Sequence, residues 1–232
     1  MEGIYCGPPP VPDAIWMRWN FDPYLLAALA LFALIVGRNR PGAAAIAVLA
    51  VVFVSPLCAL SSALFSARVV HHVLLIAVAA PLLAWSLPAR EARSPALSFA
   101  VSSAVLWAWH VPAAYDLALS HFGVYWTMQV TLLATATWFW RDVFAAARSP
   151  VDGLVFIVAG FAQMGMLGAI LTFAPEALYA AHAVGPFAWG LTPLGDQQLG
   201  GLLMWVPAGL PYAVAGAVVA RRGWAGLQGQ NA

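Results

Sequence analysis

Long apolar runs separated by short polar stretches follow one another along almost the whole chain. An α-helix that crosses roughly 30 Å of hydrocarbon needs about 20 mainly apolar residues, and most of these runs approach that length. They are continuously apolar, whereas the strands of a membrane barrel would alternate in polarity. The pattern therefore predicts an all-α, polytopic membrane helix bundle with seven transmembrane helices, at about 23–37, 42–60, 69–87, 96–109, 123–140, 153–173 and 198–220.

The composition agrees with a chain that lies in lipid. Of its 232 residues, 63% are hydrophobic and 8% are charged, whereas a water-soluble domain carries about 25% charged residues. We expect an outer N-terminal segment (1–22), one transmembrane domain (23–222) and a cytoplasmic tail (223–232). The first residues lack the basic stretch and short apolar run of a secretory signal, so we expect this segment to be retained.

The arginines predict the orientation of the bundle. All ten basic residues are arginines, and cytoplasmic loops are enriched in Lys and Arg. Only Arg18 and Arg68 fall on one side of the predicted spans. The other side is therefore predicted to be cytoplasmic, with the N-terminus outside and the C-terminus inside; it carries Arg38, Arg40, Arg90, Arg93, Arg141, Arg148, Arg221 and Arg222.

This topology places all five histidines and both cysteines at or near the outer surface. Imidazole, thiolate and thioether groups together suit copper, especially Cu(I), better than oxygen-seeking cations. The ends of several helices could converge there. The candidate copper ligands are His71, His72, His110, Met128 and Cys58.

Structural roles for the same residues stay open. His121 and His182 lie in predicted loops, where a solvated or structural role is expected. His71 and His72 are about 100° apart on a helix, so we expect only one of them to face the bundle. Cys6 and Cys58 could form a disulfide in an oxidising compartment. The methionines could simply be packing residues.

Three motifs resemble the signatures of one known family. They are HVLLIAVAAPLL at 72–83, WHVPAAYD at 109–116 and DQQLGGLLMWVP at 196–207. In their strings, order and spacing they are similar to the polytopic, bacterial CtaG-type cytochrome c oxidase assembly factors. The resemblance extends over about 57–212, which is most of the chain.

This resemblance implies a multi-pass protein of the bacterial inner membrane that helps to mature haem-copper oxidases at the stage where copper enters. It implies oxidase subunits as partners, with other copper chaperones as a further class of partner. A transient copper ion held by few, exchangeable ligands at the periplasmic face would suit transfer to an acceptor. A metal-free scaffold that docks oxidase subunits or other assembly factors is the alternative.

The chain departs from the family pattern at two positions expected to bind metal. Relatives carry H-x-x-x-H in the third helix, where this chain has Arg68 followed by His72. Relatives also carry a Glu-His pair in the fifth helix, where this chain has Met128 and Gln129. His71 and Met128 could compensate for the missing ligands, or the metal function could be altered or lost; the sequence leaves both readings open.

Several polar residues of the motifs are candidates for supporting or partner-binding roles. Asp116 could accept a hydrogen bond from His110 and orient its imidazole, or it could cap a helix. Asp196 is expected to cap a helix that begins near Gln198. Gln197 and Gln198 could cap a helix, bind a partner or contact a ligand. The complete set is Tyr115, Asp116, Asp196, Gln197 and Gln198.

Other classes of protein fit the sequence less well. We expect no enzyme, because no nucleophile-base pair, phosphate loop or carboxylate pair is evident. A net charge of +1 gives no basic face for nucleic acid. A transporter is disfavoured because no ionisable residue is expected near the middle of a span. Lipid is the expected surrounding, and the oligomeric state stays open.

Overall fold

A computed structural model describes residues 5–88, 94–145 and 149–230. Within these ranges every regular element is helical and no strand occurs, which confirms the predicted all-α class. Residues 1–4 of the predicted outer segment, residues 231–232 of the predicted tail, and Arg90, Arg93 and Arg148 of the charge argument lie outside the described residues.

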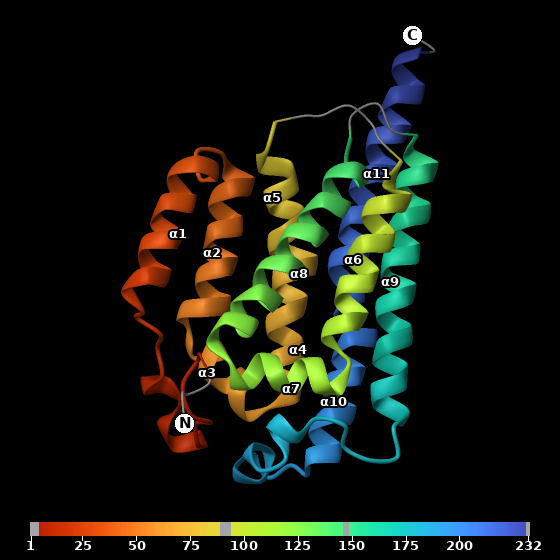
Figure 1. The fold of residues 1–232 in the computed structure, drawn as a ribbon. Helices are drawn as coiled ribbons and strands as arrows, with labels where there is room; N and C mark the ends of the chain where they lie inside the picture. Colours follow the sequence, from red (N-terminus) through yellow and green to blue (C-terminus); the bar gives the residue numbers. More distant parts are fainter. Residues whose placement is uncertain (1–4, 89–93, 146–148, 231–232) are drawn as a thin grey trace.

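The long helices run side by side as one bundle, with the two ends of the described chain at opposite ends of it (Figure 1). An odd number of crossings would place the termini in this way. The bundle consists of α1 (Pro23–Val36), α2 (Arg40–Val54), α4 (Phe65–Val73), α5 (Ala80–Ser86), α6 (Pro95–Trp109), α8 (Phe122–Val143), α9 (Pro150–Phe173), α10 (Pro193–Trp205) and α11 (Gly209–Gln230).

The composition of these helices is that of a membrane protein. Among the described residues, three helical stretches are long and apolar enough to cross a bilayer: Phe65–Ser86, Pro150–Phe173 and Pro193–Ala225. The number reaches five if each of two bent helix pairs forms one span. α1, with 14 residues, is shorter than a usual span. Seven crossings and the orientation therefore stay predictions.

Prolines explain where the helices break. Pro56 follows Ser55 and begins α3 (Pro56–Ala63), which bends by 49° from α2. Pro112 begins α7 (Pro112–Ser120), which bends by 73° from α6. The sequence predicted a loop between the spans at 96–109 and 123–140, and this was wrong for α7. A proline is accepted in the first turn of a helix, because the N–H that Pro112 lacks would have no partner there.

The predicted third span is one continuous helical stretch, but it is not a regular α-helix. Between α4 and α5, residues Leu74–Ala79 form a π-helical segment, η2. Pro81 lies two residues after its end. A proline removes one backbone donor and crowds the carbonyl four residues earlier, and a wider turn relieves this crowding. The stretch begins at Phe65, about one turn earlier than expected.

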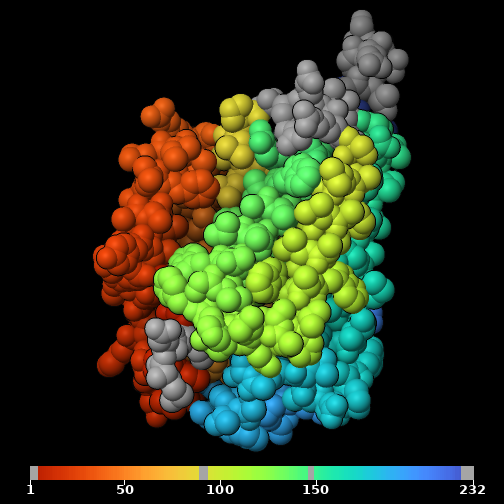
Figure 2. All heavy atoms as spheres, viewed as in Figure 1, coloured from red at the N-terminus to blue at the C-terminus, as the bar shows by residue number. Residues whose placement is uncertain are grey.

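Short elements close the lower end of the bundle in Figure 1. η1 (Pro12–Met17) lies in the N-terminal segment, and η3 (Ala180–His182) and η4 (Gly185–Trp189) lie between α9 and α10. In the space-filling view, the segment that follows α9 covers the face below α7 (Figure 2). The Trp189 indole donates to the Pro10 carbonyl at 3.1 Å, which joins two of these covering segments.

Candidate functional site

Three histidines meet inside the bundle, two from α4 and one from the end of α6. The ring centroids of His71 and His72 are 5.5 Å apart, and those of His72 and His110 are 6.4 Å apart. All three side chains are buried. The expectation that only one α4 histidine faces the bundle was wrong, because helices pack on both sides of α4: His71 contacts the Phe53 ring of α2, while His72 faces His110.

The hydrogen bonds of these histidines leave ring nitrogens free. His110 Nδ1 lies 2.7 Å from the Leu106 carbonyl. Since a carbonyl can only accept, Nδ1 carries the proton and Nε2 keeps its lone pair. His72 Nε2 and both nitrogens of His71 have no hydrogen-bond partner among the described residues. Lone pairs on neutral imidazoles are what a copper ion would need.

Asp116 does not orient His110, so that prediction was wrong. Its carboxylate accepts hydrogen bonds from the backbone N–H groups of Ala180 and Ala181, at 3.2 and 3.0 Å. These groups belong to η3, a segment about 65 residues further along the chain. Asp116 therefore holds the covering segment against α7, and His110 is oriented by the backbone of its own helix.

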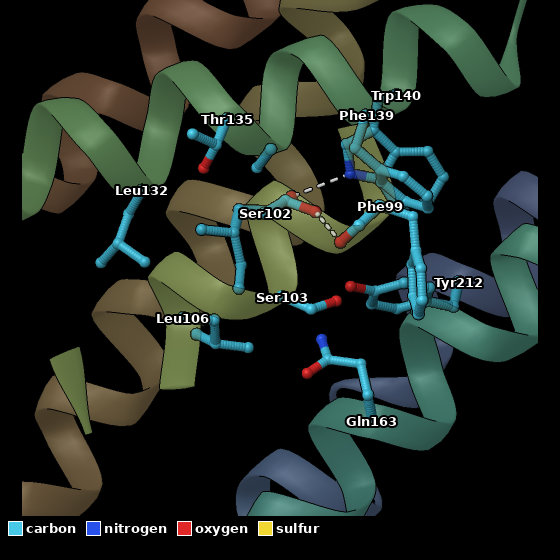
Figure 3. A pocket seen from close by; sticks show the side chains of 13 residues that line it. Phe99, Ser102, Ser103, Leu106, Leu132, Thr135, Phe139, Trp140, Gln163 and Tyr212 are labelled. Carbon is cyan, nitrogen blue, oxygen red and sulfur yellow. Dashed lines mark hydrogen bonds between the residues drawn. The ribbon is translucent and has the colours of Figure 1, made fainter. Parts of the chain in front are cut away.

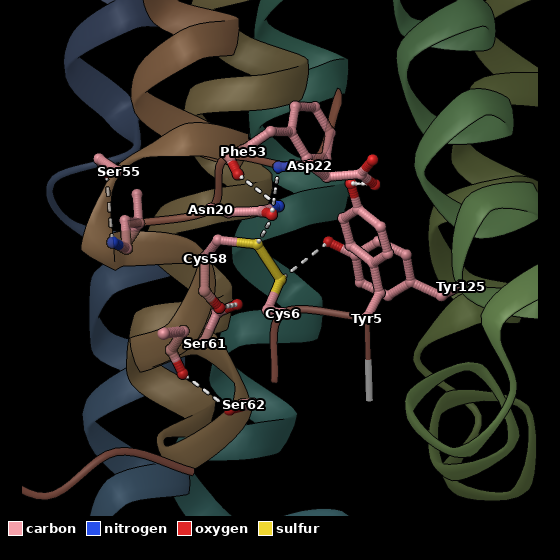
Figure 4. Close-up of a disulfide and its surroundings, with 12 residues drawn as sticks. Tyr5, Cys6, Asn20, Asp22, Phe53, Ser55, Cys58, Ser61, Ser62 and Tyr125 are labelled. Carbon is pink, nitrogen blue, oxygen red and sulfur yellow. Dashed lines mark hydrogen bonds between the residues drawn. A yellow bond between two sulfur atoms is a disulfide. The ribbon is translucent and has the colours of Figure 1, made fainter. Parts of the chain in front are cut away.

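The two sulfur candidates differ in their availability. Met128 is fully buried in α8 and belongs to the main hydrophobic core. Cys58 forms a disulfide with Cys6 (Figure 4). A disulfide sulfur is not a thiolate, so the copper-ligand role expected of Cys58 does not fit the structure; the alternative reading, a disulfide, describes it instead.

Tyr115 and His182 form a buried pair that the sequence did not suggest. The Tyr115 hydroxyl lies 2.7 Å from His182 Nε2, and His182 is 2% exposed. Burial, and then the positive charge of Arg68, lower the pKa of His182 to about 3. Of the two roles expected of His182, solvated or structural, the structure shows the structural one, because η3 folds it beneath α7. His121 is exposed and contacts the hydroxyl of neighbouring Ser120.

Asp196 caps a helix, but not the one expected. α10 already begins at Pro193 and is capped by the Thr192 side chain. The buried Asp196 carboxylate instead accepts from the backbone N–H groups of Phe65 and Ser66, at 2.6 and 3.2 Å, and from the Ser66 hydroxyl. It therefore satisfies the first turn of α4, the helix that carries His71 and His72.

The two glutamines of this motif also differ. Gln197 is buried; its Oε1 accepts from the Leu178 N–H at 2.7 Å, and its Nε2 donates to the carbonyls of Leu171 and Glu176. Gln197 thereby holds the segment that follows α9 against α10. Gln198 is half-buried on α10.

Arg68 is the residue whose environment sequence reasoning missed. It was expected near the outer surface, yet its side chain is 1% exposed. Its guanidinium lies over the Tyr125 ring, 5.4 Å from the centroid. The sequence did contain a signal for this: Arg68 precedes His71 by three residues and His72 by four, and residues at these spacings share a helix face. The charge of Arg68 therefore acts directly on the histidine cluster.

A small hollow lies between α6, α8, α9 and α11 (Figure 3). It has a volume of about 30 Å³, and Ser102, Ser103, Gln163 and Tyr212 are among the residues that line it. The Gln163 side chain accepts from the Trp107 indole at 2.9 Å, while the Ser103 hydroxyl has no partner among the described residues. A hollow of this size holds about one water molecule.

The geometry limits what metal site is possible. Within the described part of the chain, no group of three or more His, Cys, Asp or Glu side chains is placed to hold a metal ion. The arrangement therefore offers a facing pair, His72 and His110, with His71 beside it. It does not form a closed structural site of four ligands.

Comparison with protein families identifies the chain. The model of the cytochrome c oxidase caa3 assembly factor matches residues 89–225, which is more than half of the sequence. The chain belongs to this family. The match includes the motifs at 109–116 and 196–207, which confirms the resemblance predicted from the sequence. Comparisons with curated proteins and with solved structures find no match.

The family match does not reach α4. His71, His72, Arg68 and Cys58 all precede residue 89, while His110 and Met128 fall inside the matched stretch. Membership of this assembly factor family therefore rests on the second half of the bundle. The part of the site that α4 contributes has to be argued from its own geometry.

Proposed function

We propose that this caa3-family assembly factor handles copper for a haem-copper cytochrome oxidase, at the periplasmic face of the bacterial inner membrane. The observation that carries the proposal is the pair formed by His72 and His110, whose rings face each other from two helices with nitrogens left free. Copper is the cargo in this proposal, and no catalytic reaction is involved.

The low number of ligands suits a protein that passes its metal onward. Two imidazoles can hold Cu(I) only loosely, and a closed four-ligand site would retain it. His71, beside His72, and Met128 of α8 are the side chains that could add a third ligand. An oxidase subunit, or another copper chaperone, would complete the coordination and take the ion. The lipid bilayer and these proteins are the proposed partners.

Copper loading of the purified protein tests this proposal. The protein is loaded with Cu(I) in detergent, and its copper content is measured by elemental analysis. We expect near-stoichiometric copper in the wild type and its loss in the His72→Ala, His110→Ala double variant. His121→Ala is the matched control, because His121 is exposed and its ring bonds the hydroxyl of neighbouring Ser120; it should keep its copper.

A metal-free scaffold is the second candidate, and the position of Arg68 favours it. A fixed positive charge close to His71 and His72 opposes the binding of a cation. In this reading, the protein docks oxidase subunits without touching copper. Wild-type protein that takes up no specific copper, yet still co-purifies with an oxidase subunit, would replace the copper proposal with this one.

A further inference from the structure

Arg68 is a buried cation without a counterion among the described residues. Among the described residues, none of its three guanidinium nitrogens makes a hydrogen bond of good geometry, although the Tyr125 hydroxyl lies beside the guanidinium. Arginine cannot lose its proton in a protein, so this charge cannot be removed by a shift in pKa. An unpaired buried charge is strongly destabilising, and one inside an apolar bundle especially so.

Three acidic residues at this end of the bundle are not exposed, and their carboxylates bind other groups. Both oxygens of Asp196 accept from the first turn of α4. Both oxygens of Asp116 accept from η3, and those of Asp22 accept from Tyr5 and from the start of α1. None of these three residues therefore offers a free carboxylate to Arg68.

Unpaired donors converge around the same guanidinium. Arg68 and Gln129 both lie beside the Tyr125 hydroxyl, and Gln129 follows Tyr125 by one turn of α8. The Gln129 side-chain amide is 2% exposed and makes no hydrogen bond of good geometry to a described residue. His71, one turn after Arg68 on α4, is fully buried, and neither ring nitrogen has a partner in the described part of the chain. These donors match the needs of an oxyanion.

We propose that Arg68, Gln129 and His71 form a buried binding site for a small monocarboxylate anion. The planar guanidinium can donate to both oxygens of one carboxylate. The Gln129 amide and an N–H of His71 can donate to the lone pairs that remain. The anion neutralises Arg68 and satisfies the two polar groups beside it. This inference does not depend on copper binding.

The surroundings favour a small free anion over the side chain of a partner protein. Tyr5 stacks on Tyr125 with ring centroids 5.2 Å apart, and Cys6 Sγ lies 3.4 Å from the Tyr125 hydroxyl (Figure 4). The disulfide to Cys58 holds this segment in place. A protein segment would have to displace this cover, whereas an ion of a few atoms needs only a transient opening.

Sodium formate is the probe for this site. Full-length protein is freed of metal with a chelator and titrated with formate at constant ionic strength set by sodium chloride, while its melting temperature is followed. We expect a saturable rise in the wild type and none in Arg68→Gln. Arg18→Gln, which removes an exposed arginine, is the matched control and should respond like the wild type.

A second measurement covers the case in which Arg68→Gln does not fold. In Arg68→Lys the charge remains but the planar fork is lost, so formate should still bind, more weakly. The signal of ¹³C-labelled formate should broaden in the presence of wild-type protein and less with Arg68→Lys. Absence of both the melting shift and the broadening in the wild type would overturn the proposal. A response of Arg68→Gln and Arg68→Lys equal to that of the wild type would also overturn it.

Discussion

Asp196 shows how a buried acid can serve a helix other than its own. It lies in the first turn of α10, but its carboxylate accepts from the first turn of α4. Charge-assisted bonds of this kind are about twice as strong as those between neutral groups. The acid therefore determines where α4 begins, and with it the position of Arg68, His71 and His72.

His182 is expected to make the stability of the fold depend on pH. Its pKa is lowered to about 3 by burial and then by Arg68, while an unfolded chain has a histidine pKa of about 6.5. As the pH falls below about 6.5, His182 becomes protonated in the unfolded chain but stays neutral in the folded protein. The free energy of unfolding therefore drops, by up to about 1.4 kcal/mol per pH unit, until the pH reaches about 3.

Melting temperatures measured between about pH 7 and pH 5 check this dependence. His182→Gln should lose less stability over this range than the wild type, because it has no group to protonate at this position. His121→Gln, at an exposed site, should follow the wild-type curve. If all three proteins lost the same stability, His182 would not be the titrating group.

At the scale of elements, α9 and α10 touch through their backbones. A Cβ atom added to Gly201 would lie 2.5 Å from the Gly168 carbonyl oxygen, and one added to Gly168 would lie 2.8 Å from the Gly201 carbonyl oxygen. Small residues allow helices in membranes to approach in this way. The contact brings α10, and hence Asp196, to the position at which it meets α4.

Gly201→Ala is expected to separate these two helices. The added methyl group meets backbone atoms that cannot move aside, so we expect a loss of about 1–3 kcal/mol, the usual range for overpacking. Thermal unfolding in detergent measures it. Gly216→Ala on α11 is the control, since its nearest neighbour is a Leu154 methyl group at 3.7 Å; equal melting temperatures for the two variants would contradict the close packing.

At the scale of the whole molecule, one covalent bond ties the N-terminal segment to the bundle. Cys6 and Cys58 are 52 residues apart in sequence. The bond holds Tyr5 against the aromatic rings of α8, and Asn20 donates to the Phe53 carbonyl nearby. This segment therefore closes the end of the bundle at which the histidines and Arg68 lie.

The disulfide should contribute measurably to stability. A Cys6→Ser, Cys58→Ser double variant is expected to lose about 2–4 kcal/mol, because the cross-link restricts the unfolded chain. Treatment of the wild type with a reductant should lower its melting temperature to that of the variant. The same treatment should leave the variant unchanged. A wild type that did not respond to reductant, although its thiols had become titratable, would contradict this role.

The sequence by itself determined the local features of this protein. The length and continuity of the apolar runs predicted the helices, because helix formation depends on neighbouring residues. The three motifs predicted the family. Tertiary structure alone decided that both His71 and His72 are buried, that Asp196 caps α4 and that Arg68 lies inside. These outcomes depend on which helices become neighbours, and periodicity along one helix carries no information about the helix packed against it.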